Sequence, residues 1–289
     1  MRTSQQMMDL ILDAARKDEH VRAVYMNGSR ANPQVRPDPF QDFDIVFVTD
    51  SAAPPYDDRR WIAPFEPIAL LQEPDRSDSA WGEVFDTSRG YGWLMLLEDG
   101  NRIDLSLRSM EAMLAEYGQD SQTIPLLDKD GCLPPIPNAS DRSHWVPAPT
   151  EAQFASVANN FWWCLQNVAK AIRRDQVTYA MNMYIQVVHA ELEKMLDWYI
   201  ALPSGFTLSL GMWGKYYKEH LPAELYETYL QTYSDADYEH LWSAVFAACR
   251  LFSSLAVHVA NQMGFPYAAA EEAAMMHYLR QMHQPIAGI

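Results

Sequence analysis

The apolar residues of this 289-residue chain follow two different periods, and the period changes once along the sequence. Before about residue 128, short runs rich in Val, Ile, Leu and Phe lie between Gly, Asn and Asp residues, a pattern typical of β-strands. From residue 151 onward, long segments with few glycines repeat their apolar residues at the spacing of a helix. The change in period predicts an α+β region followed by an all-helical region.

The predicted α+β region begins with a helix over residues 4–18 and continues mainly as strands. Asp99-Gly100 lies between two apolar runs and is a strong signal for a tight hairpin turn. Two strands are expected on either side of that turn, within 91–109. Three more are expected at 21–26, 44–48 and 68–72. These elements predict a mixed β-sheet flanked by helices.

A proline-rich segment over residues 129–150, with five prolines, is expected to run over the surface as an extended linker. It joins a first domain, residues 1–140, to a helical second domain, residues 151–289. Three long helices are predicted at 151–176, 178–201 and 238–264, and shorter ones at 211–233 and 268–283.

Aromatic residues at helical spacing usually belong to a core. His189 in the second predicted helix is expected to be a packed histidine with a satisfied partner. The same core position is expected for the tryptophans of the helical half, which are Trp162, Trp163, Trp198, Trp213 and Trp242.

The chain carries a net charge of −16 and is 48% hydrophobic, which is ample for a packed core. A surface of this charge repels a polyphosphate backbone, so no nucleic-acid partner is expected, whereas a cationic small molecule is attracted. The charge is equally consistent with simple solubility. The three cysteines show no paired spacing and no apolar run is long enough to span a bilayer, which predicts reduced thiols, no membrane partner and a cytoplasmic location.

Asp42 and Asp44 lie in or beside an apolar strand, where an unpaired buried charge is costly. Residues two apart in a strand leave the same face, so the two carboxylates repel each other unless a cation lies between them. Asp104 alternates in the same way with Ile103 and Leu105. If its strand lies beside that of Asp44, three carboxylates converge, and oxygen ligands of this kind suit Mg²⁺.

Gly28-Ser29 follows the strand 21–26, and the next residues, from Arg30, are expected to open a turn of helix. Backbone N–H groups at such a turn bind phosphate oxygens, and glycine lets the backbone approach them closely. Gly-Ser or Asp-x-Asp alone is a weak signal. Their combination with Asp104 is typical of phosphoryl or nucleotidyl transfer, in which metal ions neutralise the reacting phosphates.

The combination resembles the nucleotidyltransferase superfamily that includes DNA polymerase β, in which an apolar residue and Gly-Ser are followed by Asp-apolar-Asp. At a finer level the chain is similar to the aminoglycoside 6-adenylyltransferase, or streptomycin adenylyltransferase, family. The likeness runs in one register from about residue 1 to residue 283. It is carried by the segments NGSRANPQVRPDPFQDFDIVFV, WLMLLEDGNRIDLSL, NNFWWCLQNVAKAIRRDQVTYA and HAELEKMLDWYI.

The resemblance implies transfer of AMP from ATP to a hydroxyl of streptomycin, with Mg²⁺ and with release of pyrophosphate. It also implies a nucleotidyltransferase domain followed by a helical domain that binds substrate and nucleotide. Asp42 and Asp44 would be metal ligands. Gly28 and Ser29 would bind the triphosphate.

For Asp104 the resemblance implies one of two roles, a third metal ligand or the general base that takes the proton of the acceptor hydroxyl. These roles compete, because a metal-bound carboxylate is a poor base. Glu98 and Asp99 nearby remain alternatives for the base.

Three cations are candidates for phosphate contacts. Arg30 lies beside the Gly-Ser turn, although pairing with Asp38 or Asp42 explains it equally well. Lys170 and Lys215 lie in segments similar to the family, where either would meet the β- or γ-phosphate as a point charge. Exposed lysines whose stems cover apolar surface explain both at least as well.

Two other interpretations keep the predicted fold. One is a nucleotidyltransferase with a different small-molecule or protein acceptor. The other is a nucleotide-binding member without streptomycin activity, against which the three retained carboxylates argue.

Overall fold

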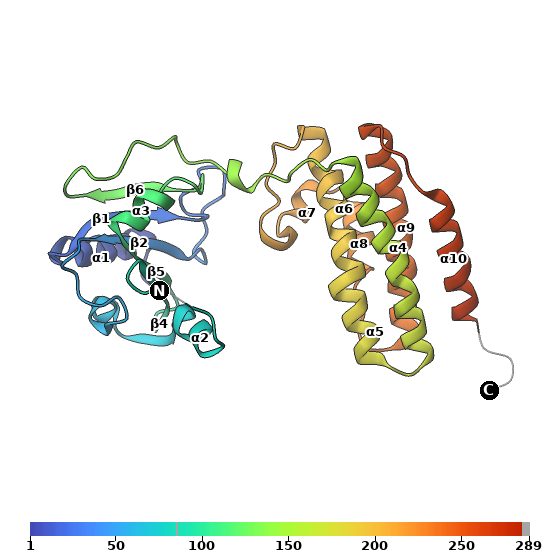
Figure 1. The fold of residues 1–289 in the computed structure, drawn as a ribbon, viewed down its shortest axis with the longest axis horizontal. Helices are drawn as coiled ribbons and strands as arrows, with labels where there is room; N and C mark the ends of the chain where they lie inside the picture. The colour runs from blue at the N-terminus through green and yellow to red at the C-terminus, as the bar shows by residue number, and fades with distance from the viewer. Residues whose placement is uncertain (85, 285–289) are drawn as a thin grey trace. The chain divides into compact units, whose positions relative to one another are not determined.

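The computed structural model describes residues 1–84 and 86–284 and divides the chain into two compact units, Met1–Ser143 and His144–Ile289 (Figure 1). The first unit is α+β and the second is helical, which confirms the predicted fold class. The boundary between the units falls inside the proline-rich segment 129–150.

In the described part of the first unit, six strands form one sheet in the order β3-β4-β5-β2-β1-β6, with β2 and β5 parallel and the other neighbours antiparallel. The strands are β1 (Val21–Asn27), β2 (Phe43–Thr49), β3 (Ile68–Gln72), β4 (Gly90–Leu97), β5 (Arg102–Ser109) and β6 (Ile124–Asp128). The first five confirm the predicted strands. β6 lies outside them because its run Ile-Pro-Leu-Leu-Asp is short and contains a proline, which is tolerated at a sheet edge.

The two faces of this sheet are covered differently. On one face, the apolar odd-numbered residues of β2 and β5 share a core cluster with Met7, Ile11 and Ala15 of helix α1 (Ser4–Lys17). On the other face, Val46 and Val48 pack with Met113 of helix α3 (Met110–Glu116). The remaining short elements of the unit are α2 (Pro74–Ala80), η1 (Arg59–Trp61) and η2 (Ala63–Phe65), and η3 (Arg142–His144) lies at its boundary.

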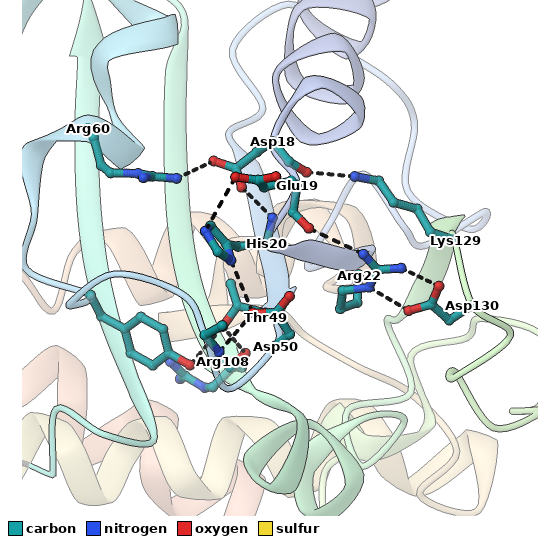
Figure 2. Close-up of polar contacts among 12 residues, drawn as sticks. Asp18, Glu19, His20, Arg22, Thr49, Asp50, Arg60, Arg108, Lys129 and Asp130 are labelled. Carbon is teal, nitrogen blue, oxygen red and sulfur yellow. Dashed lines mark hydrogen bonds and ion pairs between the residues drawn. The ribbon is translucent and has the colours of Figure 1, made fainter.

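Lys129, the residue after β6, ties the end of α1 to the sheet (Figure 2). Its ammonium donates to the carbonyls of Ala15 and Asp18 at 2.8 Å each and to that of Arg16 at 3.3 Å. The last carbonyls of a helix have no partner inside it, and a cation there also interacts favourably with the helix dipole. Asp18 is held in turn by Arg60 at 3.0 Å, so that α1, β6 and η1 meet at one point.

The described part of the second unit is built mainly of helices, and a longer segment with two short turns joins α6 to α7 (Figure 1). They are α4 (Glu151–Arg173), α5 (Val177–Met183), α6 (Ala190–Ala201), α7 (Tyr217–His220), α8 (Ala223–Leu230), α9 (Tyr238–Met263) and α10 (Ala269–His283), with turns η5 (Leu202–Ser204) and η6 (Met212–Gly214). A π-helical segment, η4 (Tyr184–His189), joins α5 to α6. The helix predicted at 178–201 is therefore helical along its length, with altered hydrogen bonding in the middle.

Three of the five tryptophans of this unit, Trp162, Trp198 and Trp242, are buried as predicted. The prediction is wrong for Trp163 and Trp213, which are 65% and 89% exposed. Trp163 follows the buried Trp162 directly, and neighbours along a helix face in different directions. Trp213 lies in η6 with a φ of +54°, so helical spacing does not apply to it.

Helix α9 has an unusually apolar sequence. Among the described residues it is the one helix long and apolar enough to cross a membrane, and 61% of its most apolar window is buried inside the protein. Its residues Leu241, Val245, Phe252 and Leu255 belong to the core of the second unit, which accounts for this composition.

A polar cluster lies where η4 meets α6. His189 contacts the Thr232 hydroxyl at 2.9 Å and the Glu193 carboxylate at 3.3 Å, which confirms it as a packed histidine with satisfied partners. One turn further along α6, Asp197 accepts a hydrogen bond from the Tyr217 hydroxyl. Burial raises the pKa of Asp197 to about 6; the Tyr217 hydrogen bond opposes this shift, and the Glu193 carboxylate adds to it.

Replacing Lys129 by Met keeps the apolar stem and removes the three donors. We expect the free energy of unfolding to fall by about 1–2 kcal/mol, because carbonyls at the end of α1 lose their partner. Denaturant unfolding checks this, with Lys17→Met as the matched control, since Lys17 is an exposed lysine in the last turn of the same helix. A loss in Lys129→Met no larger than in Lys17→Met would contradict the capping role.

Asp197 predicts a pH-dependent stability. A carboxyl whose pKa is raised in the fold stabilises it below the unfolded value of 3.8, and that contribution is lost as the pH rises through about 6. Asp197→Asn keeps an acceptor for Tyr217, so we expect it to exceed the wild type by about 1–2 kcal/mol at pH 8 and to match it near pH 4.

Denaturant unfolding at both pH values measures the difference. Glu227→Gln, an exposed position on α8, is the control for removing one negative charge. An equal gain for Asp197→Asn at the two pH values would show that the carboxyl does not titrate as its burial requires.

Candidate active site

The three predicted carboxylates come together at the start of β2 and β5. In this parallel pair Asp44 lies opposite Asp104, and Asp42 is the residue just before β2. Their neighbours Phe43 and Ile103 are buried on the α1 face, so the carboxylates lie on the opposite face of the sheet. The expectation that the strand of Asp104 lies beside that of Asp44 is confirmed, and the roles of the three residues stay predictions.

Gly28 lies in the turn after β1, against the side chain of Asp44. Its φ is +77°, a conformation that favours glycine. A Cβ at this position would lie 2.1 Å from a carboxylate oxygen of Asp44. The glycine therefore lets the backbone of the turn approach the carboxylate.

The turn itself is not the start of a helix. The N–H of Ala31 donates to the carbonyl of Gly28 at 3.0 Å, and that of Asn32 to Ser29 at 3.3 Å. Pro33 follows, and the residue before a proline is disfavoured in helical conformation. The predicted helix after Ser29 is thus wrong, and the backbone forms successive tight turns instead.

Arg30 supports the segment that carries Asp42. Its guanidinium donates to the carbonyl of Gln41 at 2.7 Å and to that of Asp42 at 3.0 Å, and it lies 3.9 Å from the centre of the Phe43 ring. The side-chain amide of Gln41 donates to the Ser29 hydroxyl at 3.3 Å. Arg30 and Ser29 therefore connect the Gly28 turn to the start of β2, and their phosphate-binding roles stay predictions.

Arg102 belongs to the same site, although it is absent from the residues predicted from the sequence. Its Nε and Nη2 atoms donate to the two carboxylate oxygens of Asp104, each at 2.7 Å. Its Nη1 atom lies 3.4 Å from Oδ2 of Asp42. The signal is present in the segment Asn-Arg-Ile-Asp, because residues two apart in a strand share a face.

Negative charge is concentrated at this site. Burial raises the pKa of Asp44 to about 6, and the carboxylates of Asp104 and Asp42 act in the same direction. Burial also raises the pKa of Asp42, against the opposing charge of Arg102. A divalent cation would relieve this repulsion, and carboxylate oxygens are the ligands that Mg²⁺ prefers.

The geometry differs from that of a ready metal site. Across residues 1–84 and 86–284, no group of three or more His, Cys, Asp or Glu side chains is arranged to hold a metal ion. At the three aspartates, the Arg102 guanidinium takes up both oxygens of Asp104 and approaches Asp42. The three carboxylates are ligands of the kind that Mg²⁺ prefers. The Arg102 guanidinium lies between Asp42 and Asp104, where an ion shared by these aspartates would lie.

The alternatives near Asp104 are placed differently. Asp99 pairs with Arg2, whose Nε is 2.7 Å from Oδ2 of Asp99, and accepts a hydrogen bond from the N–H of Asn101. The Arg2 contact holds the pKa of Asp99 well below its ordinary value. Asp99 thus anchors the start of the chain to the hairpin turn, whereas Glu98 is exposed in that turn.

A surface cavity of about 440 Å³ lies at the opposite end of the same strands. It is lined by Thr49 and Asp50 at the end of β2, by Ser109 at the end of β5, and by Tyr56 and Arg89 among others. The candidate site is therefore not part of this cavity.

Lys170 and Lys215 belong to the second unit. Lys170 is exposed on α4, and Lys215 is exposed after η6, with its Nζ atom 5.1 Å from the centre of the Tyr216 ring. Both ammonium groups are accessible to an anion, and their contact with a phosphate stays a prediction.

Known proteins resemble this chain over nearly its full length. A family model described as streptomycin adenylyltransferase matches residues 1–282. An aminoglycoside 6-adenylyltransferase of Campylobacter jejuni is 33% identical over 285 residues, covering 97% of this chain and 96% of the relative. Another from Bacillus subtilis (strain 168) is 32% identical over 278 residues, covering 94% and 95%.

A crystal structure of an aminoglycoside 6-adenyltransferase from Bacillus subtilis matches 99% of this chain and 100% of its own, with 26% sequence identity and a TM-score of 0.49. The family model spans both units, so the aspartates, the Gly28 turn and Arg102 all lie within the matched range. The chain belongs to the streptomycin adenylyltransferase family.

Proposed function

We propose that the protein transfers AMP from ATP to a hydroxyl of an aminoglycoside and releases pyrophosphate, with streptomycin as the first acceptor to test. The observation that carries the proposal is the meeting of Asp42, Asp44 and Asp104 on one sheet face beside the Gly28 turn, in a chain of this family. The two relatives compared above are named aminoglycoside 6-adenylyltransferases, which supports the donor and the acceptor class.

The carboxylates of Asp42 and Asp44 would hold Mg²⁺. Bound there with the nucleotide, the ion supplies positive charge against the triphosphate and the leaving pyrophosphate. Asp44 suits this role because it is half-buried beside two other carboxylates, so its own charge is poorly compensated. The Gly28 turn would bring backbone close to the phosphates, since glycine leaves no side chain in the way.

In the proposed reaction the acceptor hydroxyl oxygen attacks the α-phosphorus of ATP. The bond from this phosphorus to the oxygen that bridges to the β-phosphorus breaks, and pyrophosphate leaves with that oxygen. The hydroxyl proton passes to a base, for which Asp104 is the candidate if it is not a metal ligand. Arg102 donates to both carboxylate oxygens of Asp104 and so fixes the orientation of this carboxylate.

The charge of the chain supports a cationic acceptor. Its net charge of −16 attracts polycations over a distance of about a Debye length, roughly 8 Å at physiological salt. Aminoglycosides combine several cationic groups with many hydroxyls, so the same molecule satisfies both the electrostatics and the proposed chemistry.

Pyrophosphate release from MgATP, measured with and without streptomycin, tests the proposal. We expect release that depends on streptomycin in the wild type and falls at least about a hundredfold in Asp44→Ala, because the charge on the phosphates loses its support. Asp50→Asn, at the opposite end of β2, is the matched control, and circular dichroism reports whether each variant is folded.

Unchanged turnover in Asp44→Ala would contradict the mechanism. Release with another hydroxylated cation but not with streptomycin would keep nucleotidyl transfer and replace the acceptor. Binding of ATP without release for any acceptor would identify a nucleotide-binding member without transferase activity.

The proposed phosphate contacts of Lys170 and Lys215 are tested separately. We expect Lys170→Met or Lys215→Met to raise the KM for ATP about tenfold, since a hydrogen bond to a charged group contributes about 1.5–3 kcal/mol. Lys218→Met, an exposed lysine on α7, is the control. Equal KM values in the three variants would remove both lysines from the nucleotide site.

A further inference from the structure

One guanidinium, that of Arg102, holds two of the three aspartates of the site. Nε and Nη2 donate to the two oxygens of Asp104 at 2.7 Å, and Nη1 lies 3.4 Å from Oδ2 of Asp42. The contact with Asp104 is bidentate, the geometry in which arginine binds carboxylates most specifically. Asp104 is therefore fully engaged and Asp42 partly so.

This contact uses the atoms that a cation would need. The two oxygens of Asp104 already accept from the guanidinium, and a divalent cation brought to them would meet its positive charge. In keeping with this, the described residues contain no group of three or more such ligands arranged to hold a metal ion. Donor chemistry favours a divalent cation, while the observed geometry favours the arginine.

Arg102 is placed so that it can leave. Its side chain is 44% exposed and it is the first residue of β5. Leu96, the residue of β4 that pairs with Arg102, is 41% exposed. Ile103, which follows Arg102 in β5, is fully buried on the other face of the sheet. Partly exposed ion pairs contribute little to stability. The guanidinium is thus able to turn away without any change in the sheet.

We propose that Arg102 competes with the divalent cation for Asp42 and Asp104 and so acts as a positioning residue, an inference that rests on the proposed function. Without nucleotide, the guanidinium holds the two aspartates and keeps the affinity for a free divalent cation low. A triphosphate offers the guanidinium other anionic oxygens, so Arg102 releases the aspartates when cation and nucleotide are both present. Binding of the cation and binding of the nucleotide are coupled through this residue.

The same release would decide when Asp104 becomes available. Both oxygens of Asp104 accept from Arg102, so in this contact neither is free for a cation or for the proton of an acceptor hydroxyl. Once Arg102 turns away, Asp104 is free to serve as a ligand or as a base. Either role then begins only when the site is loaded.

Binding of Mn²⁺, followed by the electron paramagnetic resonance of the free ion, tests the inference without turnover. The full-length wild type is compared with Arg102→Met, which keeps the stem, and with Arg102→Lys, which keeps the charge but loses the bidentate geometry. Arg108→Met is the matched control, because Arg108 is on the same strand and pairs with Glu116 instead.

Without nucleotide, we expect Arg102→Met to bind Mn²⁺ roughly tenfold more tightly than the wild type, Arg102→Lys to be intermediate, and Arg108→Met to match the wild type. With α,β-methylene-ATP, which cannot be cleaved between its α- and β-phosphorus atoms, the wild type should gain affinity and the gap should close. Thermal unfolding in EDTA reports whether the variants are folded; should Arg102→Met fail this test, Arg102→Lys carries the comparison.

Equal affinities of the wild type and Arg102→Met without nucleotide would overturn the inference. A value for Arg102→Lys equal to the wild type would overturn it as well, since charge alone would then explain the effect. Both results would leave the proposed function standing. Absence of Mn²⁺ binding in every protein, even with the nucleotide analogue, would overturn the proposed function and the inference with it.

Discussion

The parallel pairing of β2 with β5 is the constraint on which the first unit depends. It places Asp44 opposite Asp104, and it sends the odd-numbered residues of both strands to the face covered by α1. Because side chains alternate along a strand, a shift of one residue in either strand would exchange its carboxylates with its core residues. Burial of the apolar face and convergence of the carboxylates are therefore two results of one register.

Two arginines answer the negative charge of this site in different ways. Arg30 donates hydrogen bonds to the backbone carbonyls of Gln41 and Asp42 and lies on the Phe43 ring. It therefore fixes the conformation of the segment before β2. Arg102 instead contacts carboxylate side chains, those of Asp104 and Asp42. The Arg30 contacts involve the backbone, whereas the Arg102 contacts join a partly exposed guanidinium to side chains alone.

Much of the fold follows from the sequence, because period and turn signals are local. Such local signals predict the strands on either side of Asp99-Gly100, the long helices and the three aspartates of the site. What fails depends on context: Pro33 prevents the helix after Ser29, and Trp213 is exposed because its segment leaves the helical spacing. Arg102 is a third case: its spacing from Asp104 on β5 is visible in the sequence, whereas its approach to Asp42, just before β2, arises only when the sheet pairs the two strands.

The two faces of the sheet have different roles: one carries the apolar core residues and the other carries the carboxylates of the candidate site. The alternation of apolar residues on the α1 face is enough to specify the strands and their register, and none of the site carboxylates takes part in it. A descendant of this chain that lost its aspartates would keep the same architecture and the same likeness to its relatives. The architecture of the first unit therefore depends on the buried side chains, and the proposed activity depends on a few polar side chains on the opposite face of the sheet.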